Sequence, residues 1–364
     1  MNPPADETAP SFLIIRRDNI GDLVCTTPTL RALRARYPQA RICLFVNSYN
    51  ADVLAHSPDV DEIYVYTKLK HRAPGQSAVG VLAQRVAQWA QLRRRRFGYV
   101  IIAGSAPGMV LRSARFARLL KPRHIIAFAD MAGTAPPGVD MPVARVARSL
   151  HEVEDTFRLL GPLGIGGEPP RMYVRPDADE VARAEAMFPP AGGAARARIA
   201  VHISARKPSN RWSEDRFIAL IREIHRREPA VFMLFWAPGT ADDPKHPGDD
   251  AKARAIIEAL KDVPIVACPT EQLGQLIGGL AICDRVICSD GGALHLAAAL
   301  GKPILCFFGK SDARRWHPWG VPHVLLQPPS EDAADVSVAE AFAGFLRLTQ
   351  ASARPEGQAP AAFA

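Results

Sequence analysis

The chain has 364 residues, 48% of them hydrophobic and 23% charged, which is the composition of a globular protein, and its length predicts two domains. The formal net charge is +8, and the excess lies entirely in residues 1–170, which hold 22 Lys and Arg against 14 Asp and Glu. Residues 171–364 hold 23 of each kind. The first half is therefore expected to meet an anionic partner: nucleic acid, an anionic membrane face or an anionic substrate.

The termini and the cysteines indicate the compartment. No uninterrupted apolar run reaches about 18 residues, which excludes a transmembrane helix. The first ten residues lack the basic and apolar regions of a signal peptide. The six cysteines form no Cys-x-x-Cys pair and lie in or beside apolar runs, so we expect buried, reduced thiols in a cytoplasmic protein.

The first half alternates predicted strands with predicted helices. Strands are expected at 11–16, 41–46, 62–66, 99–103 and 124–128, and helices at 22–37, 52–56, 79–95, 109–120 and 146–163. A Gly/Pro-rich loop is expected at 132–142. This alternation predicts an α/β domain with a parallel, doubly wound sheet.

A second alternating series follows a stretch of linker composition at 164–176. Strands are expected at 199–203, 231–235, 264–267, 285–288, 304–308 and 324–326, and helices at 214–227, 250–260, 272–281, 293–300 and 336–348. We therefore predict two doubly wound, Rossmann-like domains, 1–168 and 169–350, that face each other across a cleft. The Ala/Pro/Gly-rich residues 351–364 are expected to form a disordered tail.

The chain is organised around residues 286–309, VICSDGGALHLAAALGKPILCFFG, which predict a strand, a tight turn, a buried helix and a second strand. The turn at Asp290, Gly291 and Gly292 opens a helix at the carboxyl edge of a parallel sheet, where ligands bind. Backbone N–H groups and the helix dipole favour an anion there, and a diphosphate is the expected ligand. The simpler alternative is an ordinary turn in which Asp290 caps the helix.

The run RRDNIGD, residues 16–22, follows the first predicted strand and opens a helix, so it lies at the ligand edge of the first sheet. A helix N-terminus favours an ionised Asp22, and such a carboxylate can accept a proton from a hydroxyl nucleophile. The alternative is that Asp22 only caps the helix.

The run SARKPSNRW, residues 204–212, follows the first strand of the second half. One loop beside the start of a helix carries three cations, Arg206, Lys207 and Arg211, and this pattern predicts a phosphate-binding site. The alternative is a solvated basic loop. A third basic run, Arg93–Arg96, ends a helix, where cations are favoured, and it lacks the interleaved aromatic side chains of a nucleic-acid site.

Several catalytic motifs are absent. The chain has no G-x-x-x-x-G-K-[ST] loop, no G-x-G-x-x-G after a strand, no G-x-S-x-G and no H-E-x-x-H. These absences argue against simple kinases, dehydrogenases and hydrolases.

Four blocks carry a family resemblance. They begin at residues 16 (RRDNIGDLVCTTPTLRALRARYPQARICLFV), 151 (HEVEDTFRLLGPLGI), 204 (SARKPSNRW) and 289 (SDGGALHLAAALGKPILCFFG). With these blocks, residues 12–348 resemble glycosyltransferase family 9, the heptosyltransferases of lipopolysaccharide core assembly. The resemblance implies a GT-B fold, an N-terminal acceptor domain and a C-terminal domain for a nucleotide sugar, usually ADP-heptose. It also implies transfer that inverts the anomeric centre with no metal or other cofactor.

The resemblance assigns roles by position. Asp22 matches the proposed catalytic base, and Arg17, Asn19 and Gly21 lie beside it on the acceptor side. The donor and phosphate side is expected to comprise Ser204, Arg206, Lys207, Arg211, Asp290, Gly291, Gly292 and His295. The basic first half fits an anionic lipid-linked oligosaccharide as acceptor, with peripheral contact to the inner membrane face and no nucleic acid.

Two positions depart from the family pattern. Asn210 stands where the family commonly has Lys, and Gly291 stands where it usually has Ser or Thr. Lys207 or Arg211 is expected to replace the missing cation, with Lys207 favoured because it lies nearer the strand end. These departures leave the donor sugar open.

Two other functions remain open from the sequence. A nucleotide-sugar epimerase can share the two-domain architecture, although the one-sided basic charge argues against it. A non-catalytic lipopolysaccharide-binding protein would not need Asp22 or the cations of the 204–212 loop.

Overall fold

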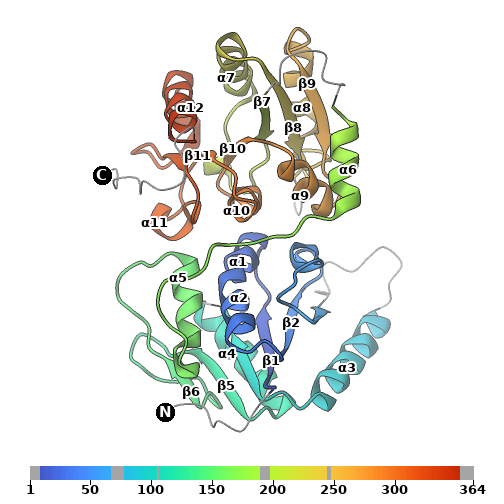
Figure 1. Cartoon of the computed structure of the whole chain (residues 1–364), viewed down its shortest axis with the longest axis vertical. Coiled ribbons are helices and arrows are strands. Elements are labelled where there is room, and N and C mark those ends of the chain that lie inside the picture. The colour runs from blue at the N-terminus through green and yellow to red at the C-terminus, as the bar shows by residue number, and fades with distance from the viewer. Residues whose placement is uncertain (1–8, 67–77, 105, 189–196, 244–246, 353–364) are drawn as a thin grey trace. The chain divides into compact units, whose positions relative to one another are not determined.

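The computed structural model describes residues 9–66, 78–104, 106–188, 197–243 and 247–352. The chain divides into two compact units, Met1–Arg175 and Pro176–Ala364 (Figure 1). Each unit is an α/β structure and is described here by itself.

The first unit alternates strands with helices along most of its length. Its strands are β1 (Ser11–Arg16), β2 (Arg41–Asn47), β3 (Glu62–Tyr66), β4 (Tyr99–Ile102), β5 (His124–Phe128) and β6 (Met141–Val143). Its helices are α1 (Ile20–Val24), α2 (Thr27–Arg36), η1 (Ala51–Leu54), α3 (Ala78–Arg94), α4 (Pro107–Leu120), α5 (Glu152–Phe157) and η3 (Arg158–Leu163).

Within the described residues, the strands of the first unit form one parallel sheet in the order β3-β2-β1-β4-β5-β6. On one face, Leu13 and Ile15 of β1 pack in a buried cluster with Leu92 of α3 and with Val110 and Ala114 of α4. Central strands covered on both faces explain the nearly continuous apolar runs from which the sheet was predicted.

Two predicted helices of the first unit are wrong in detail. The expected helix 22–37 is two helices, because Pro28 near the start of α2 has no N–H to continue the ladder. The hydroxyls of Thr26 and Thr27 donate instead to the carbonyls of Asp22 and Val24. The expected helix 146–163 starts only at Glu152 and tightens into η3, which contains Pro162. The expected loop 132–142 leads into the short edge strand β6.

The second unit repeats the same plan. Its strands are β7 (Ala197–His202), β8 (Ala230–Trp236), β9 (Ile265–Pro269), β10 (Arg285–Ser289), β11 (Ile304–Phe307) and β12 (His323–Leu326). Its helices are α6 (Ala178–Ala186), η4 (Pro208–Asn210), α7 (Glu214–Arg227), α8 (Asp250–Ala259), α9 (Leu273–Ala281), α10 (Gly292–Ala299), α11 (Ala313–Trp316), η5 (Ala333–Asp335) and α12 (Val338–Ser352).

The described strands of the second unit form a parallel sheet in the order β12-β11-β10-β7-β8-β9. Helices α6 and α11 were not predicted. Helix α12 includes the first two residues of the tail expected from 351 on, and residues 353–364 lie outside the described part of the chain.

The described part of the chain contains no helix with the length and apolar character needed to span a bilayer. All six cysteines are buried and none forms a disulfide, as expected for reduced thiols.

Candidate active site

Both sheets reverse their strand order beside their first strand. Strand β1 lies between β2 and β4, and β7 lies between β8 and β10. In open α/β sheets, ligands bind outside the carboxyl ends of the strands at such a switch point. The predicted site residues of each unit follow the carboxyl ends of these strands, so each unit has its own candidate site.

In the first unit the candidate site is built on Arg16, the last residue of β1, whose side chain is completely buried. Its guanidinium donates to Asp22 Oδ1 at 3.0 Å, to Glu152 Oε1 at 2.6 Å and to the carbonyl of Ala103 just beyond β4. Its Nε also lies 3.0 Å from Asp18 Oδ1. Arg16 therefore connects the end of β1 and the segment just beyond β4 to the carboxyl groups of Asp18, Asp22 and Glu152.

The carboxyl group of Asp22 is held at both oxygens. Oδ1 accepts from Arg16, and Oδ2 accepts from the backbone N–H and the side-chain amide of Asn19, at 3.0 and 2.9 Å. Asn19 is the N-cap of α1, and Asp22 is the third residue of that helix. The side chain of Asp22 is 12% exposed, so a small part of it remains open to a ligand. The structure thus fixes Asp22 at the ligand edge of the sheet.

Asp18 is the unusual member of this cluster. Burial of its carboxyl group raises its pKa to about 6. The charge of Arg16 lowers this pKa, and the negative charges of Asp22 and Glu152 raise it further. Burial would lower the pKa of Arg16, but Asp18, Glu152 and Asp22 together raise it above its usual range. Three carboxyl groups around one buried cation leave excess negative charge, and protonation of Asp18 relieves it.

Side chains from the β2 edge hold the loop that carries these groups. Asn47 donates to the carbonyls of Arg17 and Asp18, and the hydroxyl of Tyr49 donates to the carbonyl of Asp18. These bonds come from residues about 30 positions along the chain, so the loop is fixed by tertiary contacts.

The three residues predicted on the acceptor side have different surroundings. Asn19 caps α1, and Gly21 is buried in it. The guanidinium of Arg17 lies over the rings of Phe45, Tyr66 and Phe116 at 5.4, 5.3 and 5.9 Å and donates to Ser113. Arg17 is therefore packed among aromatic side chains, and burial lowers its pKa.

In the second unit the candidate site is centred on Asp290, immediately after β10. Its Oδ2 accepts from the hydroxyl of Ser311 at 2.5 Å and from the amide of Asn210 at 3.0 Å, and Lys207 Nζ lies 3.9 Å away. Asn210 is buried and also accepts from the backbone N–H of Gly309 at 2.9 Å. Asn210 therefore ties the segment after β7 to the segments after β10 and β11.

The two cations considered as replacements for the family lysine point to different places. Lys207 donates to the hydroxyl of Ser311 at 2.9 Å, beside Asp290. Arg211 donates from Nε to the carbonyl of Ala205 on its own loop. Both residues, and Arg206, are exposed. The structure thus places Lys207, and not Arg211, beside the start of α10.

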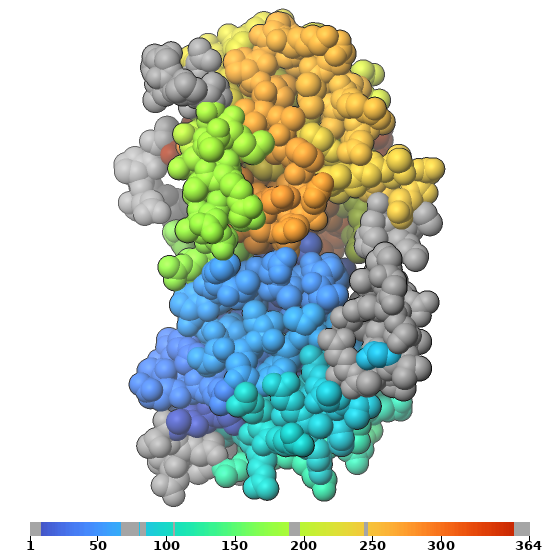
Figure 2. Space-filling model, turned by 90° about the vertical axis from the view of Figure 1, so that its right-hand side faces the viewer, coloured from blue at the N-terminus to red at the C-terminus, as the bar shows by residue number. Residues whose placement is uncertain are grey.

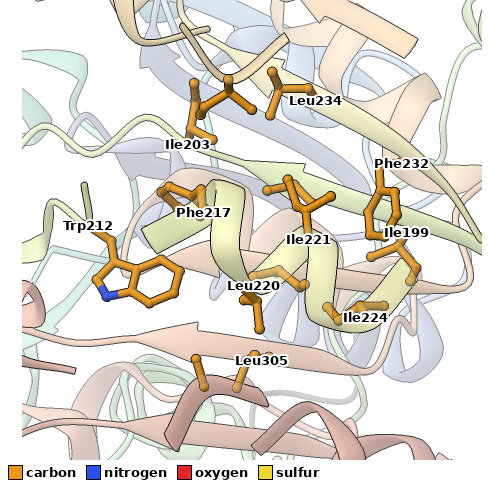
Figure 3. Close-up of a cluster of buried hydrophobic side chains, with 14 of the residues drawn as sticks. Ile199, Ile203, Trp212, Phe217, Leu220, Ile221, Ile224, Phe232, Leu234 and Leu305 are labelled. Carbon is orange, nitrogen blue, oxygen red and sulfur yellow. The ribbon is translucent and has the colours of Figure 1, made fainter. Parts of the chain in front are cut away.

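Buried contacts anchor both ends of the 204–212 loop. Trp212 stacks on Phe307 with ring centres 4.4 Å apart and donates to the carbonyl of Val336. Figure 3 shows Trp212 beside Phe217 in the buried cluster. The ammonium of Lys252 donates to the carbonyls of Ile203 and Trp212, at 3.1 and 2.6 Å. The loop backbone is therefore fixed while its cationic side chains face outward.

The remaining predicted donor residues surround this network. Gly291 is the N-cap of α10 and Gly292 its first residue. His295 is buried in α10, with its ring edge-to-face against Trp316 at 5.8 Å. The hydroxyl of Ser204 accepts from the backbone N–H of Ala237, so it fixes the loop after β8.

Sequence reasoning gave no role to Arg16, Glu152 or Lys252, and it placed Ser311 beside the donor block only through the family resemblance. An arginine at the end of a buried strand was the only signal for the Arg16 cluster. Glu152 lies 136 positions from Arg16, and nothing in the local pattern joins the two. Among the described residues, no three His, Cys, Asp or Glu side chains are grouped so as to hold a metal ion.

Comparisons with known proteins place the chain in a family. A family model described as glycosyltransferase family 9 (heptosyltransferase) matches residues 85–342. Lipopolysaccharide heptosyltransferase 3 of Escherichia coli is 23% identical over 324 residues, which cover 82% of this chain and 83% of that protein.

Solved structures show the same fold. The glycosyltransferase family 9 protein of Veillonella parvula DSM 2008 has a TM-score of 0.75 at 15% identity, covering 94% of this chain and 97% of that one. Escherichia coli heptosyltransferase WaaC, solved with ADP-2-deoxy-2-fluoro heptose, has a TM-score of 0.71 at 18% identity, covering 93% and 99%. The predicted GT-B fold is confirmed, and the chain belongs to glycosyltransferase family 9.

Proposed function

We propose that this glycosyltransferase moves a heptose from ADP-heptose onto an anionic glycolipid of the lipopolysaccharide core, with inversion at the anomeric carbon. The observation that carries the proposal is the carboxyl group of Asp22, held at both oxygens at the switch point of the first sheet. Its family relatives include a lipopolysaccharide heptosyltransferase and a heptosyltransferase solved with an ADP-heptose analogue.

Asp22 acts as the general base. It accepts the proton of the acceptor hydroxyl while the hydroxyl oxygen forms a bond to the anomeric carbon of the donor. The bond from that carbon to the diphosphate breaks, and its electron pair leaves with ADP. Attack opposite the leaving group inverts the anomeric centre. Arg16 and Asn19 position the carboxylate, so that it needs no rearrangement when the acceptor binds.

The second unit stabilises the departing diphosphate. The amide groups at the start of α10 and the ammonium of Lys207 supply positive potential where negative charge develops. Asp290 and Ser311 orient Lys207, and Asn210 fixes Asp290. These groups can stabilise the leaving group without a metal ion or another cofactor.

The assay that tests this function incubates the protein with ADP-heptose, with and without a core acceptor. Acceptor-dependent release of ADP with formation of a heptosylated glycolipid is the expected result. Conversion of the nucleotide sugar without acceptor would identify the epimerase, which the family match does not favour. Binding of the glycolipid without turnover would identify a non-catalytic binding protein.

The same assay tests the proposed independence from metal. Treatment with EDTA should leave the rate of transfer unchanged. Loss of activity that added magnesium restores would contradict the proposed role of Lys207 and α10.

A further inference from the structure

One segment of the first unit contains cations and no acidic residue. Residues 63–129 hold 13 Lys and Arg and no Asp or Glu. At the chain's overall ratio of 37 acidic to 45 basic residues, about 11 acidic residues would accompany them. The segment itself therefore carries only positive charge. Two acidic residues outside it lie beside it in the structure: Glu62 pairs with Arg95, and Asp140 lies 2.7 Å from Nδ1 of His124.

The structure gathers many of these cations at the amino edge of the sheet. Arg93, near the end of α3, donates to the carbonyl of Leu119 near the end of α4, so the two helix ends lie together. Arg95 pairs with Glu62 at the start of β3. Arg123 donates its backbone N–H to Phe97, just before β4 and β5 begin. Asp22 lies at the opposite, carboxyl edge, so this surface is separate from the candidate active site.

Five exposed cations form what we call the cationic face: Arg94, Arg96, Arg115, Arg118 and Lys121. Within the described ranges, none of the five has a recorded carboxylate partner. Figure 2 shows atoms coloured cyan to teal, the colours of α3 and α4, at the surface of the first unit. Helix dipoles favour cations at these two helix ends, but they do not explain the absence of acidic residues over the whole segment.

Exposed aliphatic side chains occur on the two helices that carry the cationic face. Leu119, beside Arg118 at the end of α4, and Val86, in the middle of α3, are each 57% exposed. Arginines mixed with exposed aliphatic side chains suit the interface of an anionic bilayer, where the cations meet headgroups and the apolar groups enter the acyl boundary. A nucleic acid would instead favour exposed aromatic rings on which bases stack.

We propose that the C-terminal ends of α3 and α4 form a docking face for an anionic lipid bilayer. This rests on the proposed function only in that the acceptor is a membrane glycolipid. Strand β1, with six residues, spans about 20 Å between the two edges of the sheet. Docking at the amino edge would hold Asp22 away from the lipid surface, which suits an acceptor sugar separated from its lipid by other sugars.

The test measures binding to vesicles with neither donor nor acceptor present, so its result is independent of catalysis. The full chain should bind vesicles of equal parts phosphatidylcholine and phosphatidylglycerol, and should not bind pure phosphatidylcholine. The triple variant Arg94→Gln, Arg115→Gln, Arg118→Gln should bind about 100-fold more weakly, because each cation near an anionic surface contributes about fivefold. It should still fold and turn over a soluble acceptor, since all three side chains are exposed and distant from Asp22.

A matched control removes three exposed arginines from the second unit: Arg183→Gln, Arg227→Gln and Arg347→Gln. It has the same net charge as the first triple variant and should bind vesicles like the unmodified protein. Equal weakening by both triple variants would show that net charge alone drives binding and would overturn the proposal. Tighter binding to duplex DNA than to the anionic vesicles would also overturn it, because the face would then suit a nucleic acid.

Discussion

The segments at the ends of β1 and β7 occupy the same place in two sheets of the same topology, but Arg16 of the first is buried, whereas the cations of the second are exposed. At the end of β1, Arg16 is completely buried and paired with Asp18, Asp22 and Glu152. After β7, the cations Arg206, Lys207 and Arg211 are exposed, while neutral Asn210 is buried.

This difference in burial indicates which role each loop suits. A buried cation that is already paired with carboxylates cannot reach a ligand, but it holds a carboxylate in one position. Exposed cations on a loop whose backbone is anchored by Lys252 and Trp212 lie at the surface, where an anion can approach them. The loop after β1 therefore suits a general base held in a fixed position, and the loop after β7 suits a phosphate-binding site.

The largest effect in the second loop should come from Lys207→Ala. Removal of one charge-assisted contact to the diphosphate should weaken ADP binding by roughly 10–150-fold, as measured by isothermal titration. Arg211→Ala is the matched control and should weaken it less than about threefold, because the Nε of Arg211 donates to its own loop. If both variants bind ADP like the unmodified protein, the loop is only a solvated surface.

In the first loop, Asp18→Asn should make the protein more stable above pH 6. A carboxyl group whose pKa rises on folding, here to about 6, stabilises the folded state at low pH and loses that contribution as the pH rises through 6. The variant should gain roughly 1–3 kcal/mol in unfolding free energy near neutral pH, as measured by urea denaturation. Exposed Asp52→Asn serves as the control and should change little. A destabilised Asp18→Asn would mean that Arg16 requires the negative charge of Asp18.

The smallest effect should come from restoring a hydroxyl at the start of α10. A Cβ atom at Gly291 would meet nothing closer than the carbonyl oxygen of Ser289, at 4.0 Å. Gly291→Ser should therefore fold normally and tighten ADP binding by about 2–12-fold through one hydrogen bond.

Gly309→Ser is the matched control for that substitution. A Cβ atom at Gly309 would lie 2.0 Å from the carbonyl oxygen of Ser209, so this variant should lose stability. A stable Gly291→Ser variant with weaker ADP binding would mean that the donor does not approach this turn.

Most of the fold could be predicted because the sheet strands are short apolar runs bounded by turn residues. Helix α7, with its regular apolar spacing, has the bounds that the sequence predicted. The breaks in the expected helices 22–37 and 146–163 depend on Pro28 and Pro162 together with tertiary contacts. Strand β6 could not be predicted, because its three residues carry no period of their own and pair only with β5.

The candidate site was predicted only in part. The loops were found because glycine, acidic and basic residues follow strands, which is a local pattern. The partnership of Arg16 with Glu152 and that of Asn210 with Asp290 join distant segments, so no local pattern reveals them. Asn210 stands where the family commonly has Lys, and its contacts could not be predicted from the sequence. A neutral amide there accepts from Gly309 and donates to Asp290, which leaves the positive charge to Lys207.

The substitution Asp22→Asn tests whether Asp22 is the base of the sugar transfer. Transfer from ADP-heptose to a core acceptor should fall by about 10²–10⁴-fold, because the amide cannot accept the hydroxyl proton. Affinity for ADP, measured on the same sample, should stay close to that of the unmodified protein, since the proposed donor residues lie in the second unit. A variant that keeps more than roughly a third of the original turnover would contradict the account and reduce Asp22 to part of the helix cap.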